Sequence, residues 1–162
     1  MTRAVSKIAA AAVLLMMADG AIAQTKTKAP VPVNIEADQM EILDADKKAV
    51  FTGNVDATRG DTHLSAAKLT VTYADVKQPD GTSKTDATDL DARGDVTIKT
   101  PKETITGEWA KFDPQGNRLT VGGNVKLVQG STVLTGNELH ADLNTDKIEM
   151  KGGRVKGSFL PK

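Results

Sequence analysis

The chain contains no cysteine, which excludes a disulfide scaffold, a Cys-ligated zinc site, an iron–sulfur cluster and thiol catalysis. Only two of the 162 residues are histidines, so most transition-metal sites would lack their usual ligands. Basic and acidic residues balance at 21 each, without the basic excess that a nucleic-acid-binding protein needs. The sequence also has neither a G-x-S-x-G elbow nor a phosphate-binding loop. We therefore expect a protein that is not an enzyme and uses no metal and no cofactor.

The N-terminus has the organisation of a secretory signal peptide, predicted over residues 1–23. Arg3 and Lys7 precede an uninterrupted apolar run at 8–18, and an A-x-A cleavage site follows. The run is shorter than the roughly 20 residues that a helix needs to span a bilayer. We expect cleavage and export to the periplasm, with a retained anchor as the alternative. The polar, proline-bearing segment 24–32 is expected to be a flexible arm.

A Gly-x-Val tripeptide recurs along the rest of the chain. Its four copies begin at Gly53, Gly94, Gly123 and Gly153. The spacing indicates a repeat of about 29 residues, with an insertion in the second repeat that we expect to form a mobile loop over 74–89. Short runs of alternating apolar and polar residues begin at the valine of the first three tripeptides, and no helical period is sustained. The domain over 33–160 is therefore predicted to be all-β.

Each repeat contains two apolar residues five positions apart. The pairs are Ile35 and Met40, Leu64 and Leu69, Ile105 and Ala110, and Leu134 and Leu139. In a straight strand the two members of a pair would point to opposite faces. If both point inwards, a bulge or corner must lie between them, at 66–68, 107–109 and 136–138. Strands that turn a corner once per repeat predict two facing sheets built by stacking.

Four segments carry a resemblance to a known family. They are 35–40 (IEADQM), 51–55 (FTGNV), 121–125 (VGGNV) and 134–139 (LTGNEL). Together they resemble the OstA-like domain of LptA-type lipopolysaccharide transport proteins, over nearly all of 33–159. The resemblance implies a periplasmic, open-ended twisted β-jelly roll that shields the acyl chains of lipid A. It also implies a bridge between an inner-membrane LptC-like protein and an outer-membrane LptD-like protein, and end-to-end self-association. Unpaired terminal strands would let these partners bind by edge-strand addition. An LptC-like protein with the same fold is the alternative within the pathway.

The inward-facing apolar residues would form the lipid-binding interior. They are Ile35, Met40, Ile42, Phe51, Val55, Leu64, Leu69, Val71, Ile98, Ile105, Phe112, Leu119, Val121, Val125, Leu127, Leu134, Leu139, Leu143, Ile148 and Met150. Alternation alone is also typical of a structural or adhesive repeat protein with a filled core. The low aromatic content, 3% of the chain, favours a slot that can admit a long acyl chain.

The two ends of the predicted stack differ in charge. The first edge carries the acids Glu36, Asp38 and Glu41, and the last carries the bases Lys151, Arg154 and Lys156. Opposite charges favour head-to-tail strand addition between chains or with partners. Ordinary protection of exposed edge strands by charge explains the same pattern.

Overall fold

The computed structural model describes residues 31–161, so the predicted signal peptide and most of the predicted flexible segment 24–32 lie outside the described residues. The described part is one antiparallel sheet of ten strands, with a single turn of 3-10 helix, η1, after β2. The elements are β1 (Asn34–Glu36), β2 (Gln39–Leu43), η1 (Asp44–Asp46), β3 (Lys48–Arg59), β4 (Thr62–Lys77), β5 (Ser83–Lys99), β6 (Thr104–Asp113), β7 (Arg118–Gln129), β8 (Thr132–Asp142), β9 (Lys147–Lys151) and β10 (Lys156–Ser158). Within these residues no helix has the length and apolar character needed to cross a bilayer.

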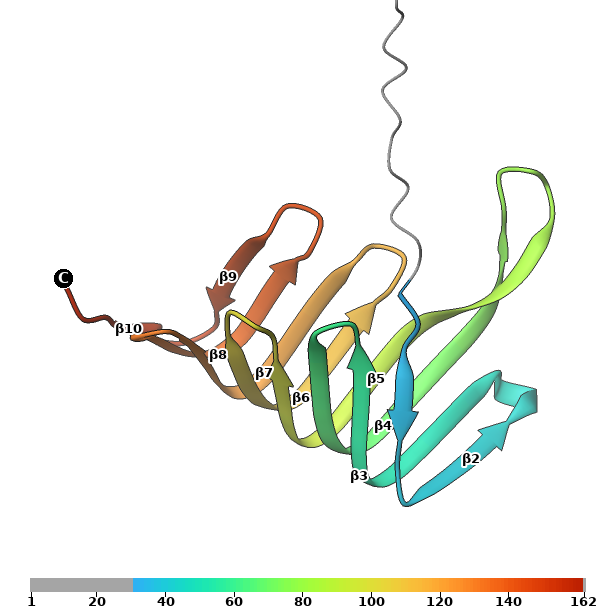
Figure 1. Cartoon of the computed structure of the whole chain (residues 1–162), viewed down its shortest axis with the longest axis horizontal. Coiled ribbons are helices and arrows are strands. Elements are labelled where there is room, and N and C mark those ends of the chain that lie inside the picture. The colour runs from blue at the N-terminus through green and yellow to red at the C-terminus, as the bar shows by residue number, and fades with distance from the viewer. Residues whose placement is uncertain (1–30, 162) are drawn as a thin grey trace, which may run out of the picture. The chain divides into compact units, whose positions relative to one another are not determined.

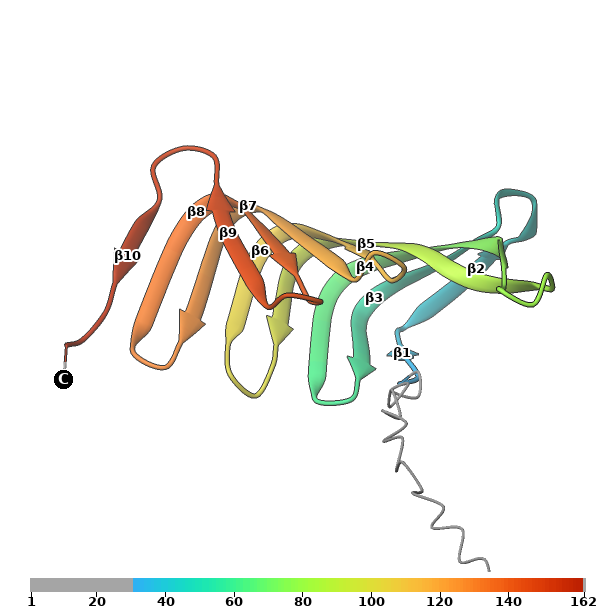
Figure 2. The same ribbon diagram turned by 90° about the horizontal axis from the view of Figure 1, so that it is seen from above.

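The sheet is bent along a line that crosses every long strand, so that it forms a V-shaped trough (Figure 1). Its strand order is β1-β3-β4-β5-β6-β7-β8-β10, with β2 paired to the other half of β3 and β9 to the other half of β8. We call the side that contains β2 and β9 arm A, and the side that contains β1 and β10 arm B. The hairpin tips of arm B lie in a row (Figure 2). The trough is open at both ends, as predicted for a twisted β-jelly roll of stacked repeats.

The bend arises from the glycine and the following residue of the first three Gly-x-Val tripeptides. In the first, Gly53 and Asn54 have φ angles of +81° and +44° and lie together opposite the single residue Ala67 of β4. Glycine and asparagine tolerate this left-handed conformation, and the extra residue bends the strand. The predicted corners therefore lie at the correct height along the strands. The bulges, however, are on β3, β5 and β7, in the strands that pair with the predicted segments 66–68, 107–109 and 136–138. The positive φ angles lie at Gly53-Asn54, Gly94-Asp95 and Gly123-Asn124, whereas Gly107 and Gly136 in the predicted segments do not have positive φ.

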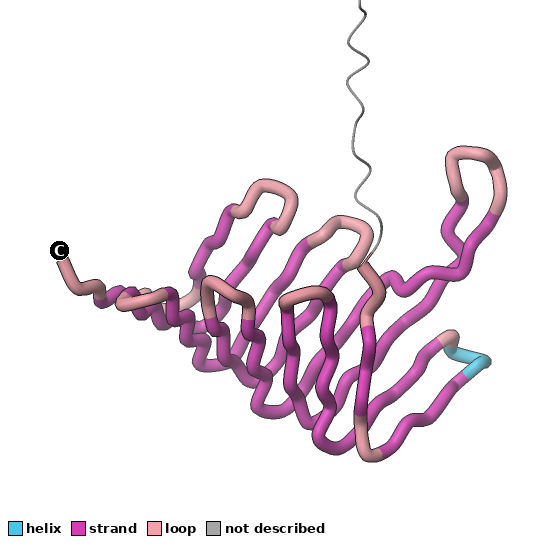
Figure 3. Tube along the Cα trace, in the orientation of Figure 1, coloured by secondary structure: helices cyan, strands magenta, loops and turns pink. Residues whose placement is uncertain are grey.

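The predicted mobile loop at 74–89 is wrong. After one register shift between Thr72 and Tyr73, strands β4 and β5 continue through the insertion as an antiparallel ladder as far as Lys77 and Ser83, and only the five residues 78–82 form the tip (Figure 3). The hairpin is fastened to the β2–β3 tip, where the Lys47 Nζ lies 3.0 Å from an Asp75 carboxylate oxygen. Thr85 donates a hydrogen bond of 2.7 Å to the same carboxylate. Paired strand backbones thus extend arm A despite the polar composition of the segment.

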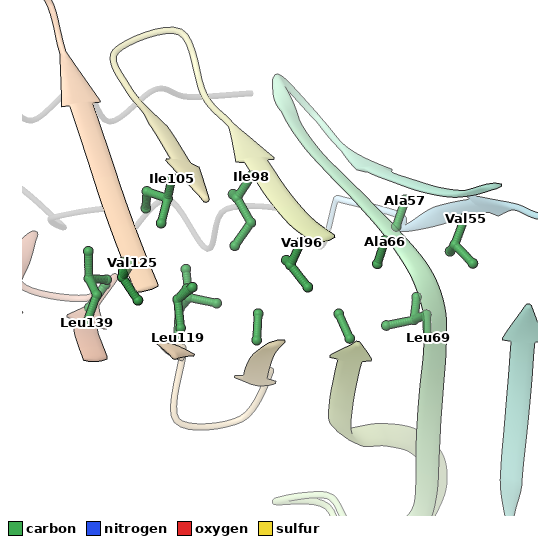
Figure 4. Close-up of a cluster of buried hydrophobic side chains, with 14 of the residues drawn as sticks. Val55, Ala57, Ala66, Leu69, Val96, Ile98, Ile105, Leu119, Val125 and Leu139 are labelled. Atoms are coloured by element: carbon green, nitrogen blue, oxygen red, sulfur yellow. The ribbon is translucent and has the colours of Figure 1, made fainter. Parts of the chain in front are cut away.

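The core lies between the two arms, along the base of the trough (Figure 4). Every buried side chain of the described residues is apolar, and none is larger than leucine or isoleucine. Leu69, Val121 and Leu139 of arm A and Val55, Val96 and Val125 of arm B are each less than 2% exposed. Medium-sized aliphatic side chains from facing arms therefore fill the base of the trough and hold the bent sheet together.

Candidate functional site

The predicted interior residues fall into three groups along one continuous inner face. Ten are buried: Val55, Leu69, Val71, Ile98, Ile105, Leu119, Val121, Val125, Leu127 and Leu139. Six are half-buried and pack against this core: Ile35, Phe51, Leu64, Phe112, Leu134 and Met150. Four are exposed: Met40, Ile42, Leu143 and Ile148. The first two groups run the length of the trough, and the last lies at its two ends.

The exposed members belong to the same face as the buried ones. Met40 and Ile42 of β2 are 58% and 61% exposed, and they pair directly with Phe51 and Ala49 of β3. At the other end Ile148 of β9 is 40% exposed and pairs with Ala141. The sequence pattern expected all of them inside. They are exposed because no further strand covers β2 or β9, so the apolar face stops abruptly at each end.

Several residues of the inner face were not among the predicted interior set. Val96 is one of these residues, and it is 1% exposed. It is the valine of a Gly-x-Val tripeptide, as are the predicted residues Val55 and Val125, which are also 1% exposed. The tripeptide itself therefore marks the first inward residue after each bend, which is a signal that the sequence carried. The small residue Ala92 is also buried between the arms, at 1% exposure. Ala110, which the five-residue step from Ile105 predicted to point inwards, is buried beside it at 2% exposure.

The predicted acidic residues lie on β1 and β2 or in the connection between them, and the predicted basic residues lie on β9 and β10 or in their connection. Glu36 and Glu41 belong to β1 and β2 with Asp38 between, while Lys151 and Lys156 belong to β9 and β10 with Arg154 between. Asp38 accepts a 2.8 Å hydrogen bond from the Asn54 side chain. No carboxylate of the described residues lies within 4.0 Å of the Arg154 or Lys156 cation.

Lys151, by contrast, is already paired within its own strand. Its Nζ lies 2.9 Å from a carboxylate oxygen of Glu149, and Lys147 contacts the other oxygen at 2.5 Å. The hydrogen bond from Lys147, followed by that from Lys151, lowers the pKa of Glu149 to about 2. Glu149 thus stays ionised and partly neutralises Lys151, so the unpaired positive charge of this edge rests on Arg154 and Lys156.

One row of cross-strand partners carries the charge difference across all of arm B. Its members in spatial order are Glu36, Asp56, Ser65, Thr97, Thr106, Lys126, Thr135 and Lys156. The row begins with two acids, continues through uncharged hydroxyl residues and ends with lysines. Arm B therefore has opposite charges on the outer face of its two terminal strands.

A hollow of about 270 Å³ lies on the opposite side of arm A from the core. The side chains of Arg118, Thr120, His140 and Glu149 on β7–β9 contribute to its lining. His140 contacts the Glu138 carboxylate at 2.5 Å and lies 3.5 Å from the Thr120 hydroxyl. These polar contacts stabilise the pairing of β7 and β8 on the outer face, and they are separate from the apolar inner face.

The fold and the inner face define a class of protein, an open β-jelly roll whose apolar interior is exposed at both ends. Residues 34–147 match a family model described as LptA/(LptD N-terminal domain) LPS transport protein, and the chain belongs to this family. It is 29% identical over 133 residues to an uncharacterized protein of Rhizobium meliloti (strain 1021), covering 80% of this chain and 72% of that one. These matches confirm the resemblance found in the sequence.

A solved structure shares the fold. It is that of LptH of Pseudomonas aeruginosa, described as the LptA homologous periplasmic component of the lipopolysaccharide transport device. The two superpose with a TM-score of 0.70 at 16% sequence identity, over 81% of this chain and 96% of LptH. The open-ended twisted jelly roll is thus common to both chains although most of their side chains differ.

Proposed function

We propose that this protein carries lipopolysaccharide through the periplasm by shielding the acyl chains of lipid A along its inner face, without any enzymatic step. The observation that carries the proposal is the apolar strip that runs the length of the trough and stays exposed at each end, at Met40 and Ile42 and at Leu143 and Ile148. An ordinary core would be covered at its ends. The predicted signal peptide at 1–23 would direct export and then be removed.

The physical chemistry of the trough fits an acyl ligand. Burying each methylene contributes about 0.8 kcal/mol, so a chain of about twelve carbons gains on the order of 10 kcal/mol. Because the base is already filled by aliphatic side chains, acyl chains would lie nearer the mouth or spread the arms. The described residues place no buried polar side chain between the arms, so spreading would break no buried side-chain hydrogen bond.

Photocrosslinking in cells tests this proposal. A photoreactive residue at Ile105, Leu127 or Leu139 is expected to form lipopolysaccharide adducts, because all three are buried on the inner face at 0–3% exposure. Matched outward controls on the same strands are Thr104, Lys126 and Asp142, and these are expected to give none. Adducts at neither set, in a protein that is folded, would refute lipid carriage.

The filled base of the trough favours a second candidate, a structural repeat protein with a dry core. Leu69, Val121 and Leu139 are each 0% exposed, which is typical of a permanent core. Such a protein would bind no hydrophobic probe at its trough. The same photocrosslinking experiment therefore decides between the two candidates, because only the carrier yields lipid adducts.

We also propose that copies of the chain, or an LptC-like and an LptD-like partner, add to its terminal strands to form the bridge. Head-to-tail addition would bring β10 of one copy beside β1 of the next. Lys156 would then face Glu36, since the two are the last and first members of the same row on arm B.

Charge reversal tests the head-to-tail arrangement. Lys156→Glu is expected to weaken association, because it replaces an attraction with a repulsion at the junction. A mixture of Lys156→Glu and Glu36→Lys chains should recover mixed assemblies. Lys126→Glu is the matched control, since Lys126 lies in the same row two strands away from the edge. Sedimentation at low and high salt measures the result, and unchanged association of Lys156→Glu would contradict the arrangement.

A further inference from the structure

One contact crosses the mouth of the trough from arm to arm. Arg59 ends β3 at a hairpin tip of arm B, and Phe112 lies near the end of β6 in arm A. The Arg59 guanidinium carbon is 5.8 Å from the centroid of the Phe112 ring. Phe112 itself packs against the core. Two residues 53 positions apart in the sequence therefore meet above the apolar base, and a basic group is held over the inner face.

The hydrogen-bonding capacity of Arg59 is left unused by this contact. A guanidinium that lies over a ring interacts through its face, while its five N–H donors point outwards in a planar fork. Among the described residues, no group accepts a side-chain hydrogen bond from Arg59, and no carboxylate lies within 4.0 Å of it. Asp61 in the adjacent turn is the nearest acid along the chain. Lys47 at a tip of arm A differs, because Asp75 already pairs with it.

An acylated ligand held in the trough would place its headgroup at the mouth, near the Arg59 guanidinium. Its acyl chains would occupy the apolar face, so the polar end must lie at the mouth, between the tips of the two arms. A planar guanidinium fork matches the oxygens of a phosphate and can bind two of them at once. Charged hydrogen bonds of this kind are stronger than an exposed cation–π contact.

We propose that Arg59 is the headgroup-recognition residue of the trough, which leaves the Phe112 ring and binds a phosphate of the acylated ligand. In the empty protein the Arg59–Phe112 contact lies across the mouth above part of the apolar base. When the ligand is bound, the Phe112 ring is released to pack against an acyl chain. This assignment rests on the lipid carriage proposed above and adds to it the residue that distinguishes a phosphorylated headgroup from an uncharged one.

The test compares the binding of purified lipid A with that of lipid A whose phosphates have been removed. Arg59→Gln is expected to lower the affinity for lipid A by about 10- to 100-fold, the usual effect of losing a charged hydrogen bond, and to leave the affinity for the dephosphorylated lipid unchanged. Arg93→Gln is the matched control. Arg93 makes the same kind of contact, with its guanidinium carbon 5.7 Å from the Trp109 ring centroid, but on the outer face.

Phe112→Leu tests whether Arg59 recognises the phosphate itself or only holds the two arms together through the ring. It keeps an apolar side chain but removes the ring, so the preference for the phosphorylated lipid should persist. If Arg59→Gln does not fold, Arg59→Lys gives the same comparison with a smaller loss, because lysine keeps the charge without the fork.

The failure of this assignment is distinguishable from failure of lipid carriage. A wild-type protein that binds neither lipid refutes carriage and the assignment together. A wild-type protein that binds both lipids, with Arg59→Gln lowering both affinities equally or neither, overturns the assignment alone. Loss of the phosphate preference in Phe112→Leu would also overturn it, because the contact would then act only as a fastening.

Discussion

Leu139→Ala is expected to lower the free energy of unfolding by about 2–5 kcal/mol, the range for leucine truncation at buried sites. Leu139 is 0% exposed and lies between Val121 of β7 and Met150 of β9 on the inner face. Its side chain helps to fill the space where the two arms face each other. Removing it leaves a cavity at the base of the trough, which rigid strands on both sides cannot collapse to fill.

Leu143→Ala is the matched control. Leu143 follows β8 directly, on the same arm, and is 44% exposed. Its truncation is expected to cost less than about 1 kcal/mol, since little of its surface is removed from water. Urea unfolding monitored by circular dichroism gives both values. Equal costs for the two variants would show that the base of the trough is not packed, and that acyl chains could enter the base without spreading the arms.

Much of the inner face is readable from sequence because its signal is local. Alternation places Val125 and Leu127 on one face, and the structure buries both at 1–3% exposure. The five-residue step between Ile105 and Ala110 likewise predicted that both point inwards, and both are 2% exposed. These features depend only on the two-residue period of a strand and on one bend per repeat.

Other features depend on pairing, which composition does not report. The segment 74–89 is polar, and its polarity suggested a loop, yet its two halves form a ladder in which Asp75 and Thr85 are partners. The charge of Lys151 could be counted from sequence, but its contact with Glu149 depends on side-chain geometry. The Arg59–Phe112 contact joins two different repeats across the mouth, so no spacing rule could have found it.

Gly94→Ala tests the other element that shapes the trough, the bend itself. Gly94 has φ of +82°, and a Cβ added there would lie 2.7 Å from the Ala67 Cβ of the neighbouring strand. Alanine would incur both the conformational cost of a left-handed residue, about 1–2 kcal/mol, and an overpacking cost of about 1–3 kcal/mol. The total loss of stability is therefore expected to be about 2–5 kcal/mol, measured by urea unfolding.

Gly81→Ala isolates the conformational part of that cost. Gly81 has a nearly identical φ of +85°, but a Cβ added there meets nothing within 4 Å, because the residue lies at the tip of the β4–β5 hairpin. The steric part is isolated by adding Ala67→Gly to Gly94→Ala, which removes the atom that clashes. If the bend requires close approach of the two strands, the double variant should regain about 1–3 kcal/mol relative to Gly94→Ala, although Ala67→Gly alone is mildly destabilising. Equal losses for Gly94→Ala and Gly81→Ala would instead mean that the strands can move apart at the bend without cost, and that backbone conformation alone sets the angle between the arms.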